Sequence, residues 1–283
     1  MAFPILSIIN FLSPKDTGSR KAVRDVSYGA RNRQKLDIYT PRAKPAPQGG
    51  WPVVYFIYGG SWSDGSRKDY DFVGRAVAAL GFVTVIADYR LVPEVEYPAF
   101  LDDGVAAIQW VADHIDQYGG DPQRIALMGH SAGAYNAVML TLDPAHLART
   151  GLVGRIRCVV GLSGPYDFFP FDGKITLRTF GAVTEPMTTQ PIHYVSPSAP
   201  PMFLGTGDKD TLVYPRNTVA LAKRLSVVGC MVQERHYAGL GHPGPLLALG
   251  RPARAMAPVL KEIGLFLHRH LDAPVSQLTA QPA

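Results

Sequence analysis

The sequence predicts an α/β protein in which a mostly parallel central sheet is covered by helices on both faces. From about residue 50 onward, short apolar runs alternate with stretches whose apolar residues recur every three or four positions. Such runs are typical of buried parallel strands, and such stretches are typical of amphipathic helices. Strands that alternate with helices favour a parallel sheet. The length of 283 residues, nearly half of them hydrophobic, suits one large domain with a substantial core.

The first part of the chain is expected to add an outer layer to this sheet. Residues 1–19 begin with a short apolar stretch and predict an N-terminal helix or cap element that packs on the body. Residues 22–28 and 34–39 predict a leading antiparallel pair of strands. The apolar run 53–58 predicts the first parallel strand, and a turn rich in glycine follows it.

Two helices are predicted in the middle of the chain. Residues 70–80 place apolar side chains on one face, and Gly81 is a typical stop signal. Residues 99–118 carry a clear apolar stripe at spacings of three and four, and this helix ends before the turn 119–122. The apolar run 82–87 predicts the strand between the two helices.

The second half of the chain continues the same alternation. The expected strands lie at 125–128, 159–162, 202–205 and 231–236, and the expected helices at 134–140, 217–228 and 255–270. Residues 164–200 are irregular and rich in Phe and Pro, and a loop of that length in a compact domain is usually functional, so we expect a cap-like insertion there. Residues 20–271 therefore form one predicted domain, followed by a frayed tail at 272–283.

Composition excludes several classes of function. The formal net charge is +5, but Lys and Arg are scattered and no basic run exceeds a pair, which argues against nucleic-acid binding. Cys158 and Cys230 lie far apart, so neither a metal-type spacing nor a disulfide framework is expected. The apolar N-terminus lacks a basic leader and is too short to span a bilayer. We therefore expect a cytoplasmic protein without stable membrane insertion, with secretion left open.

The strongest functional signal is Gly129-His130-Ser131-Ala132-Gly133. It follows the apolar run 125–128 and precedes the helical stretch 134–140. A serine held in a sharp turn between a strand and a helix needs glycines two residues before and after it, because side chains there would collide. This setting predicts that Ser131 is a nucleophile.

Serine chemistry also needs a base and an acid that orients the base. In this arrangement both follow the serine along the chain. His242 lies in a glycine-rich loop just past the last strand, and we prefer it as the base to His236 at the end of that strand. The strand at 202–205 leads to two carboxylates, Asp208 and Asp210, and the residues alone leave the choice of acid open.

Main-chain donors for a developing oxyanion are expected at two places. The turn 58–62 follows a central strand and carries two glycines. The N–H groups of Gly60 and Ser61 in this turn, together with that of Ala132, are predicted to form an oxyanion hole.

These motifs resemble the α/β-hydrolase carboxylesterases, in particular the bacterial esterase/lipase group related to hormone-sensitive lipase and feruloyl-esterase-like proteins. The motifs that carry the resemblance are Tyr58-Gly59-Gly60-Ser61-Trp62, Asp88-Tyr89-Arg90-Leu91, Tyr118-Gly119-Gly120-Asp121-Pro122, Gly129-His130-Ser131-Ala132-Gly133 and Gly241-His242. They span roughly residues 20–270. The resemblance implies an α/β-hydrolase fold with about eight strands, a small cap segment, and residues 20–271 as the catalytic domain.

The resemblance also resolves the choice of acid. Family members often have His-Gly-x-x-Asp-x-x-Val at this place, and residues 206–213 match that pattern with Thr206 in place of the His. This register implies Asp210. The chain departs from the family at Tyr58, because the oxyanion turn of the family usually begins with His.

The implied function is hydrolysis of carboxylic esters, with short to medium acyl chains, through an acyl-enzyme on Ser131. No metal and no other cofactor is expected. The expected partner is a small-molecule ester, with a polyester as a further candidate, and the oligomeric state is left open. We expect the substrate to contact Tyr58, Trp62, His130, Tyr166 and Phe168.

Two alternatives remain. An arylformamidase-like amidase shares the Gly-Gly-x-Trp turn, so the sequence does not separate ester from amide substrates. A non-catalytic binding protein of the same fold is the other alternative. Such proteins typically lose a triad residue, whereas candidates for all three are present here.

Overall fold

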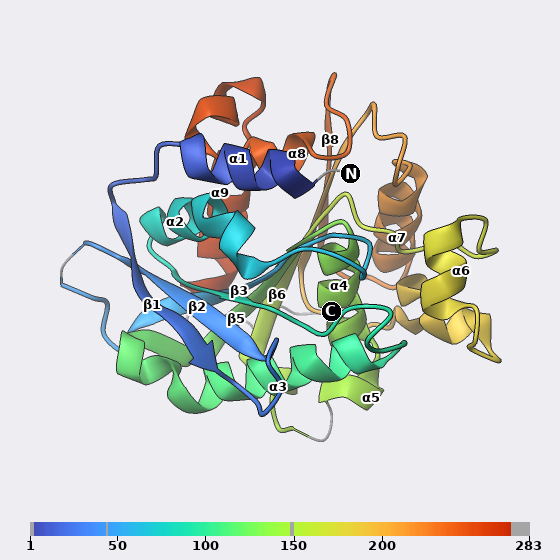
Figure 1. Ribbon diagram of the computed structural model, residues 1–283, viewed down its shortest axis with the longest axis horizontal. Coiled ribbons are helices and arrows are strands. Elements are labelled where there is room, and N and C mark those ends of the chain that lie inside the picture. The colour runs from blue at the N-terminus through green and yellow to red at the C-terminus, as the bar shows by residue number, and fades with distance from the viewer. Residues whose placement is uncertain (1–2, 44, 148–149, 273–283) are drawn as a thin grey trace.

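The computed structural model describes residues 3–43, 45–147 and 150–272 (Figure 1). In this part of the chain eight strands form one sheet, in the order β1-β2-β4-β3-β5-β6-β7-β8. The pairs β1–β2 and β2–β4 are antiparallel and all the other pairs are parallel. The strands are β1 Ser19–Ser27, β2 Lys35–Pro41, β3 Trp51–Ile57, β4 Val83–Ala87, β5 Gly120–His130, β6 Ile156–Leu162, β7 Met202–Gly207 and β8 Val232–Tyr237.

Helices cover both faces of the sheet. Helices α2 and α9 contact each other on one face, whereas α3 and α4 contact each other on the opposite face (Figure 1). The α-helices are α1 Phe3–Leu12, α2 Asp71–Ala79, α3 Ala99–His114, α4 Ala132–Leu142, α5 Pro144–Leu147, α6 Lys174–Phe180, α7 Arg216–Val227, α8 Gly244–Leu247 and α9 Val259–Leu271. None of the helices in the described ranges is long and apolar enough to cross a membrane.

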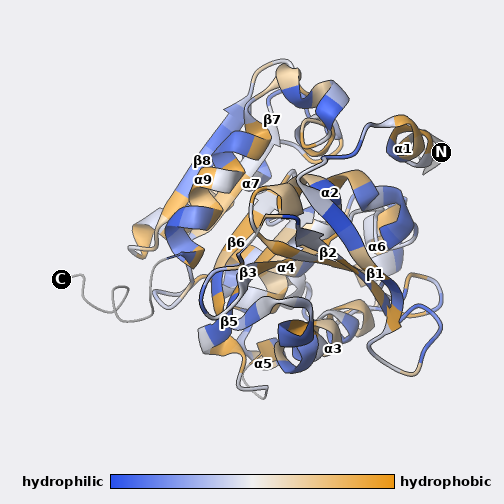
Figure 2. Cartoon of the chain, turned by 90° about the vertical axis from the view of Figure 1, so that its left-hand side faces the viewer, coloured by the Kyte–Doolittle hydropathy of each residue, from blue (hydrophilic) through white to orange (hydrophobic). Residues whose placement is uncertain are grey.

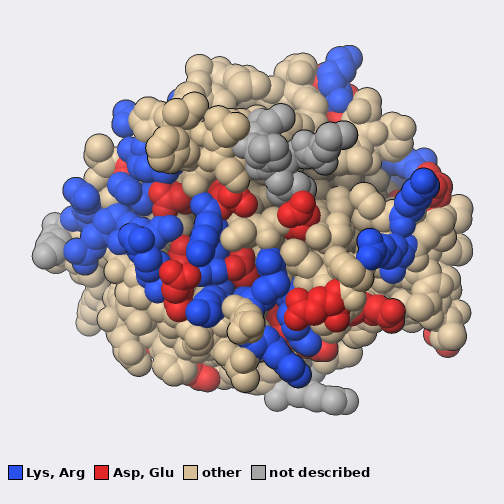
Figure 3. Space-filling model, in the orientation of Figure 1, with Lys and Arg blue, Asp and Glu red and all other residues tan. Residues whose placement is uncertain are grey.

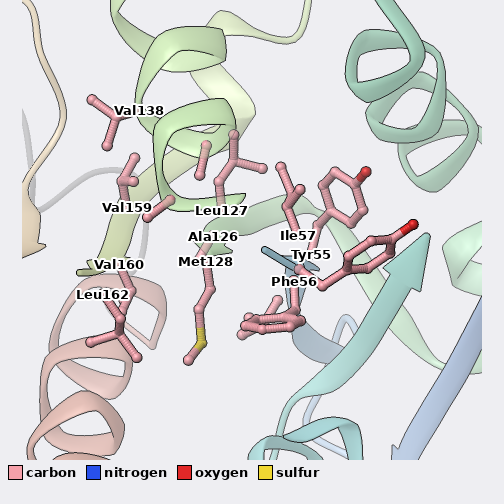
Figure 4. Close-up of a cluster of buried hydrophobic side chains, with 14 of the residues drawn as sticks. Tyr55, Phe56, Ile57, Ala126, Leu127, Met128, Val138, Val159, Val160 and Leu162 are labelled. Atoms are coloured by element: carbon pink, nitrogen blue, oxygen red, sulfur yellow. The ribbon is translucent and has the colours of Figure 1, made fainter. Parts of the chain in front are cut away.

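The core lies where the central strands meet α4. Leu127 of β5 and Val159 of β6 are fully buried and lie on the same side of the sheet as Val138 of α4, whereas Phe56, Met128 and Val160 point to the opposite side (Figure 4). The edge strand β8 is mostly hydrophilic in Figure 2, as expected for a strand with one free edge. The buried central strands form a rigid platform, and their carboxyl ends carry the loops that matter for function.

The predicted α/β architecture is confirmed, and the differences lie at the ends of elements. The predicted strand 125–128 is part of a longer strand, β5. The helix predicted to begin at residue 255 begins at Val259, because Pro258 precedes it and Arg251–Met256 forms a separate 3₁₀ helix. Apart from Asp272, the predicted frayed tail lies outside the described residues.

Helix α1 packs on the 3₁₀ helix Arg67–Tyr70. The Asn10 side chain donates to the main-chain oxygen of Lys68 (2.8 Å) and accepts from the N–H of Phe72 (3.0 Å). The segment predicted as a cap-like insertion contains α6 and two 3₁₀ helices, and α6 lies at the right-hand edge of the molecule in Figure 1.

Candidate active site

Ser131 occupies a strained turn between β5 and α4. Its φ and ψ are 56° and −125°, a conformation that few L-residues adopt. A Cβ on Gly129 would lie 2.2 Å from the main-chain oxygen of Gly133, and a Cβ on Gly133 would lie 2.0 Å from that of Ile57. Both glycines are therefore required by close approach of the backbone. The N–H of Ser131 donates to the oxygen of Leu162 at 2.8 Å, which anchors the turn to β6.

Three side chains meet at the carboxyl ends of β5, β7 and β8. The Ser131 Oγ lies 2.8 Å from Nε2 of His242, and the His242 Nδ1 lies 2.8 Å from Oδ2 of Asp210. A neutral imidazole that donates from Nδ1 to the carboxylate leaves Nε2 free to accept the serine proton. All three side chains are largely buried. The arrangement can transfer a proton from the hydroxyl to the imidazole.

Asp210, rather than Asp208, faces His242. The other oxygen of Asp210 accepts the main-chain N–H groups of Leu212 (3.0 Å) and Val213 (2.9 Å). Burial alone would raise the pKa of Asp210, but the hydrogen bonds from His242 and from these two N–H groups outweigh it and lower that pKa. Asp208 is exposed and accepts the N–H of Gly239 (2.7 Å).

His236 is not part of this cluster. Its Nε2 lies 2.6 Å from Glu234 on the same strand, and its side chain is exposed. The structure therefore separates the two histidines that the sequence offered as the base, and brings only His242 to Ser131.

The turn after β3 lies close to the serine, because a Cβ on Gly59 would be 2.9 Å from the Ser131 Cβ. Gly60, Ser61 and Trp62 all have positive φ, of 124°, 53° and 56°. Consecutive residues of this kind curve the backbone so that its N–H groups can converge on an anion. Within the described residues, the main-chain N–H groups of Gly60, Ser61 and Ala132 donate no hydrogen bond. They are free to donate to an oxygen beside Ser131.

Tyr58, which we expected at the substrate, lies beneath this turn and away from the cavity. Its ring is fully buried and stacks between Tyr70 and Tyr89, with centroids 5.3 and 4.9 Å away. Its hydroxyl donates to Asp88 Oδ1 (2.9 Å) and accepts from the Arg33 guanidinium (2.9 Å). Burial, and then the Asp88 carboxylate, raise the pKa of Tyr58 well above its usual value, so the hydroxyl stays protonated. Tyr58 supports the turn from below.

A cavity of about 570 Å³ opens beside Ser131. Ser61, Trp62, Ala132 and Phe168 line it, as the sequence suggested. Much of the remaining wall is apolar, and part of it comes from the Phe-rich segment 164–200 that we expected to be functional, which supplies Phe169 and Ile175. The other wall residues include Leu212, Val213 and Tyr214, with Asp172, Lys174 and Arg216 as the charged members.

Two further expected substrate contacts lie elsewhere. The His130 ring is buried behind the base, with its Nε2 3.0 Å from the main-chain oxygen of His242 and its ring centroid 5.0 Å from that of His242. Tyr166 is fully buried over Gly161 and Gly164, where any Cβ would overlap its ring or hydroxyl. Neither residue belongs to the cavity wall.

Asn217 and Gln190 are functional candidates that sequence reasoning missed. Asn217 Oδ1 accepts the N–H groups of Tyr166 and Asp167, both at 2.9 Å, and Gln190 Oε1 accepts those of Phe168 (2.7 Å) and Phe169 (3.2 Å). These two amides hold the cavity wall in place. The sequence offered one signal for this role, which is an amide side chain at the start of a predicted helix, as at Asn217.

No group of three or more His, Cys, Asp or Glu side chains that could hold a metal ion occurs within residues 3–43, 45–147 and 150–272.

Comparisons with known proteins bear on the family and the fold. A model of the BD-FAE family matches residues 36–225. The chain is 31% identical over 267 residues to esterase LipC of Mycobacterium tuberculosis, with 87% of this chain and 64% of that protein covered. It is 36% identical over 154 residues to a probable isoprenylcysteine alpha-carbonyl methylesterase of rice, with 53% and 36% covered. The chain thus spans between about a third and two thirds of these relatives.

Solved structures share the fold. A truncated carbohydrate esterase from gut microbiota superposes with a TM-score of 0.78 at 19% identity, over 92% of this chain and 100% of that one. The thermophilic carboxylesterase EstE1 from a metagenomic library superposes with a TM-score of 0.74 at 22% identity, over 96% and 95%. At these identities the likeness shows the α/β-hydrolase fold.

Proposed function

Since the chain belongs to the BD-FAE family and has the α/β-hydrolase fold, we propose that it is a carboxylic-ester hydrolase that works through Ser131. The observation that carries the proposal is the continuous chain of contacts from Ser131 to His242 to Asp210, with both distances at 2.8 Å. Relatives named esterase and carboxylesterase support the same reaction class.

The reaction proceeds in two steps. Ser131 Oγ attacks the ester carbonyl while its proton passes to His242 Nε2, and the protonated imidazole then gives that proton to the departing alcohol. Asp210 holds the tautomer that accepts the serine proton and stabilises the imidazolium. Water, activated by His242, then attacks the acyl-enzyme, releases the acid and restores the serine.

The negative oxygen of each tetrahedral intermediate would lie between the N–H groups of Gly60, Ser61 and Ala132. Such donors are already oriented before the reaction, so they stabilise charge as it develops. The apolar wall and the cavity volume of about 570 Å³ suit an acyl group of short to medium length.

The test is covalent labelling together with kinetics. A fluorophosphonate probe should label the protein, and Ser131→Ala should abolish labelling and lower kcat on p-nitrophenyl esters on the order of 10⁵–10⁶-fold. Circular dichroism of the variant controls for folding. Labelling that persists in Ser131→Ala would exclude this nucleophile, and faster turnover of N-formylkynurenine than of p-nitrophenyl acetate would indicate an amidase instead.

A further inference from the structure

The outward face of α1 carries three large apolar side chains that are exposed to solvent. Ile8, Phe11 and Leu12 are 55%, 87% and 70% exposed and follow the spacing of one helical face. The opposite face packs on the body through Leu6 and through the hydrogen bonds of Asn10. A helix that is apolar on both faces normally has a partner on each, so this outer stripe indicates a docking surface.

Cations gather directly beside the stripe. A shallow hollow of about 410 Å³ is lined by Asn10 and Phe11 of α1 and by charged residues of which only one is acidic. The charged members are Lys15, Lys21, Arg24, Lys68, Asp71 and Arg75. In Figure 3 the blue side chains collect on the left of the view, with acidic residues among them.

Much of this positive charge is not neutralised by carboxylates. Lys21 pairs with Asp71 and with Asp37, both at 3.0 Å, but Arg75 bonds to main-chain oxygens and to the Ser19 hydroxyl. Lys68 is 68% exposed on its side chain, with its nearest acidic oxygen 3.9 Å away. Among the described residues Arg24 has no carboxylate within 4.0 Å. The hollow therefore keeps an excess of positive charge.

The environment of Lys15 also indicates an excess of positive charge in the hollow. Its ammonium donates to the main-chain oxygens of Asn10 and Ser13 at the end of α1. Burial lowers the pKa of Lys15, and the nearby cations Arg75 and Lys21 lower it further against the opposing effect of Asp71. An anion bound in the hollow would relieve this repulsion.

We propose that α1 and the hollow form a docking surface for a membrane of anionic phospholipid. The stripe of Ile8, Phe11 and Leu12 enters the boundary between headgroups and acyl chains, and the cations contact lipid phosphates. A second copy of this chain fits less well, because a two-fold contact through the same face would bring two cationic hollows together. The cavity beside Ser131 is lined by other residues, so the docking surface and the cavity wall share none.

The experiment measures flotation of the full chain with vesicles of phosphatidylcholine alone or mixed with phosphatidylglycerol. Binding should require phosphatidylglycerol and weaken when salt rises from about 0.1 to about 1 M, which shortens the screening length from ~10 to ~3 Å. Phe11→Ser and Leu12→Ser should each weaken partitioning about tenfold. Arg24→Gln and Lys68→Gln should each weaken it about fivefold.

Matched controls lie on α7, on another part of the surface. Val227→Ser removes an apolar side chain that is 69% exposed, and Lys223→Gln removes an exposed cation. Both should bind as the parent does, and thermal melts should show that all variants fold. Because the readout is lipid binding, it is independent of ester hydrolysis.

Four results would overturn the proposal. Equal binding to both kinds of vesicle, or none to either, excludes an anionic membrane. Equal losses in the α7 controls exclude this face as the docking surface. Full competition by glycerol 3-phosphate at equal phosphate concentration would mean that the hollow binds soluble phosphate groups, and a dimer that Phe11→Ser dissociates would mean that the stripe binds a second copy.

Discussion

The turn that carries Ser131 and the wall that faces it are held by different means. Around Ser131 the main chain packs on main chain so closely that Gly129 and Gly133 leave no room for a Cβ. The cavity wall at residues 165–173 is irregular. The side-chain amides of Asn217 and Gln190 accept hydrogen bonds from the main-chain N–H groups of Asp167 and Phe168 in this segment. The comparison teaches that the reaction geometry depends on backbone contacts that tolerate no substitution, whereas the shape of the substrate cavity depends on two replaceable side chains.

The largest expected effect tests the contacts between Ser131, His242 and Asp210. Asp210→Asn should lower kcat on the order of 10⁴-fold, because an amide there favours the wrong tautomer of His242. Asp208→Asn, a matched change two residues away on an exposed side chain, should cost less than about tenfold. Steady-state kinetics on one short-chain ester decide between them, and equal losses in the two variants would mean that Asp210 has no special role.

The next effect tests the close packing directly. Gly133→Ala should lower the free energy of unfolding by more than about 4 kcal/mol or prevent folding, because its Cβ would lie 2.0 Å from the main-chain oxygen of Ile57. Gly154→Ala is the control, since an added Cβ there meets no atom within 4 Å. Denaturant titrations measure both. A Gly133→Ala protein as stable as its parent would show that the turn can relax.

A smaller effect is expected when the hydrogen bonds that hold the cavity wall are removed. Asn217→Ala removes the acceptor for two main-chain N–H groups and should cost about 1–3 kcal/mol of stability. It should change KM and acyl-chain preference more than kcat, because it does not touch Ser131 or His242. Asn217→Asp keeps the acceptor and should restore the parent preference in a series from acetate to palmitate. An unchanged preference in Asn217→Ala would show that the wall does not select the substrate.

The smallest effect at neutral pH concerns His130, whose ring lies against His242 and outside the cavity. Burial, and then His242, lower the pKa of His130 from 6.5 to about 3, so the unfolded chain binds a proton between these values that the folded chain does not. Stability should therefore fall as pH drops through this window, by up to about 1.4 kcal/mol per pH unit from this residue.

His130→Gln should flatten that dependence, and it should keep activity at neutral pH within about tenfold, because a Gln amide can still donate to the oxygen of His242. Thermal melts across the pH range provide the measurement. A variant whose melting temperature falls as steeply as the parent's on acidification would show that His130 already gains its proton in the folded state.

The sequence predicted the first region much better than the second. Close packing of the backbone around Ser131 requires glycine at fixed positions, as at Gly129 and Gly133. This requirement is visible as a sequence pattern. The choice of His242 over His236 also agrees with the geometry, because only the glycine-rich loop reaches Ser131. The alternation of strands and helices was predictable for the same reason, since burial imposes a period on the residues.

The segment 164–200 was expected to be functional, but which residues face the cavity could not be predicted, because this depends on contacts between segments far apart in the chain. The sequence around Phe168 does not indicate that the side chain of Gln190 accepts a hydrogen bond from the Phe168 N–H group. Tyr58 and Tyr166 were expected to contact the substrate, but both side chains are fully buried outside the cavity wall. Their true directions depend on Asp88, which accepts from Tyr58, and on the space that Gly161 leaves for Tyr166.

The single oxygen of Tyr58 also limits which side chains can replace it. It meets a donor, Arg33, and an acceptor, Asp88, at one atom, both at 2.9 Å. The histidine usual at this place in the family that the chain resembles would have to meet those two partners with two different ring atoms. Histidine here would therefore keep both hydrogen bonds only if one ring nitrogen donated to Asp88 while the other accepted from Arg33.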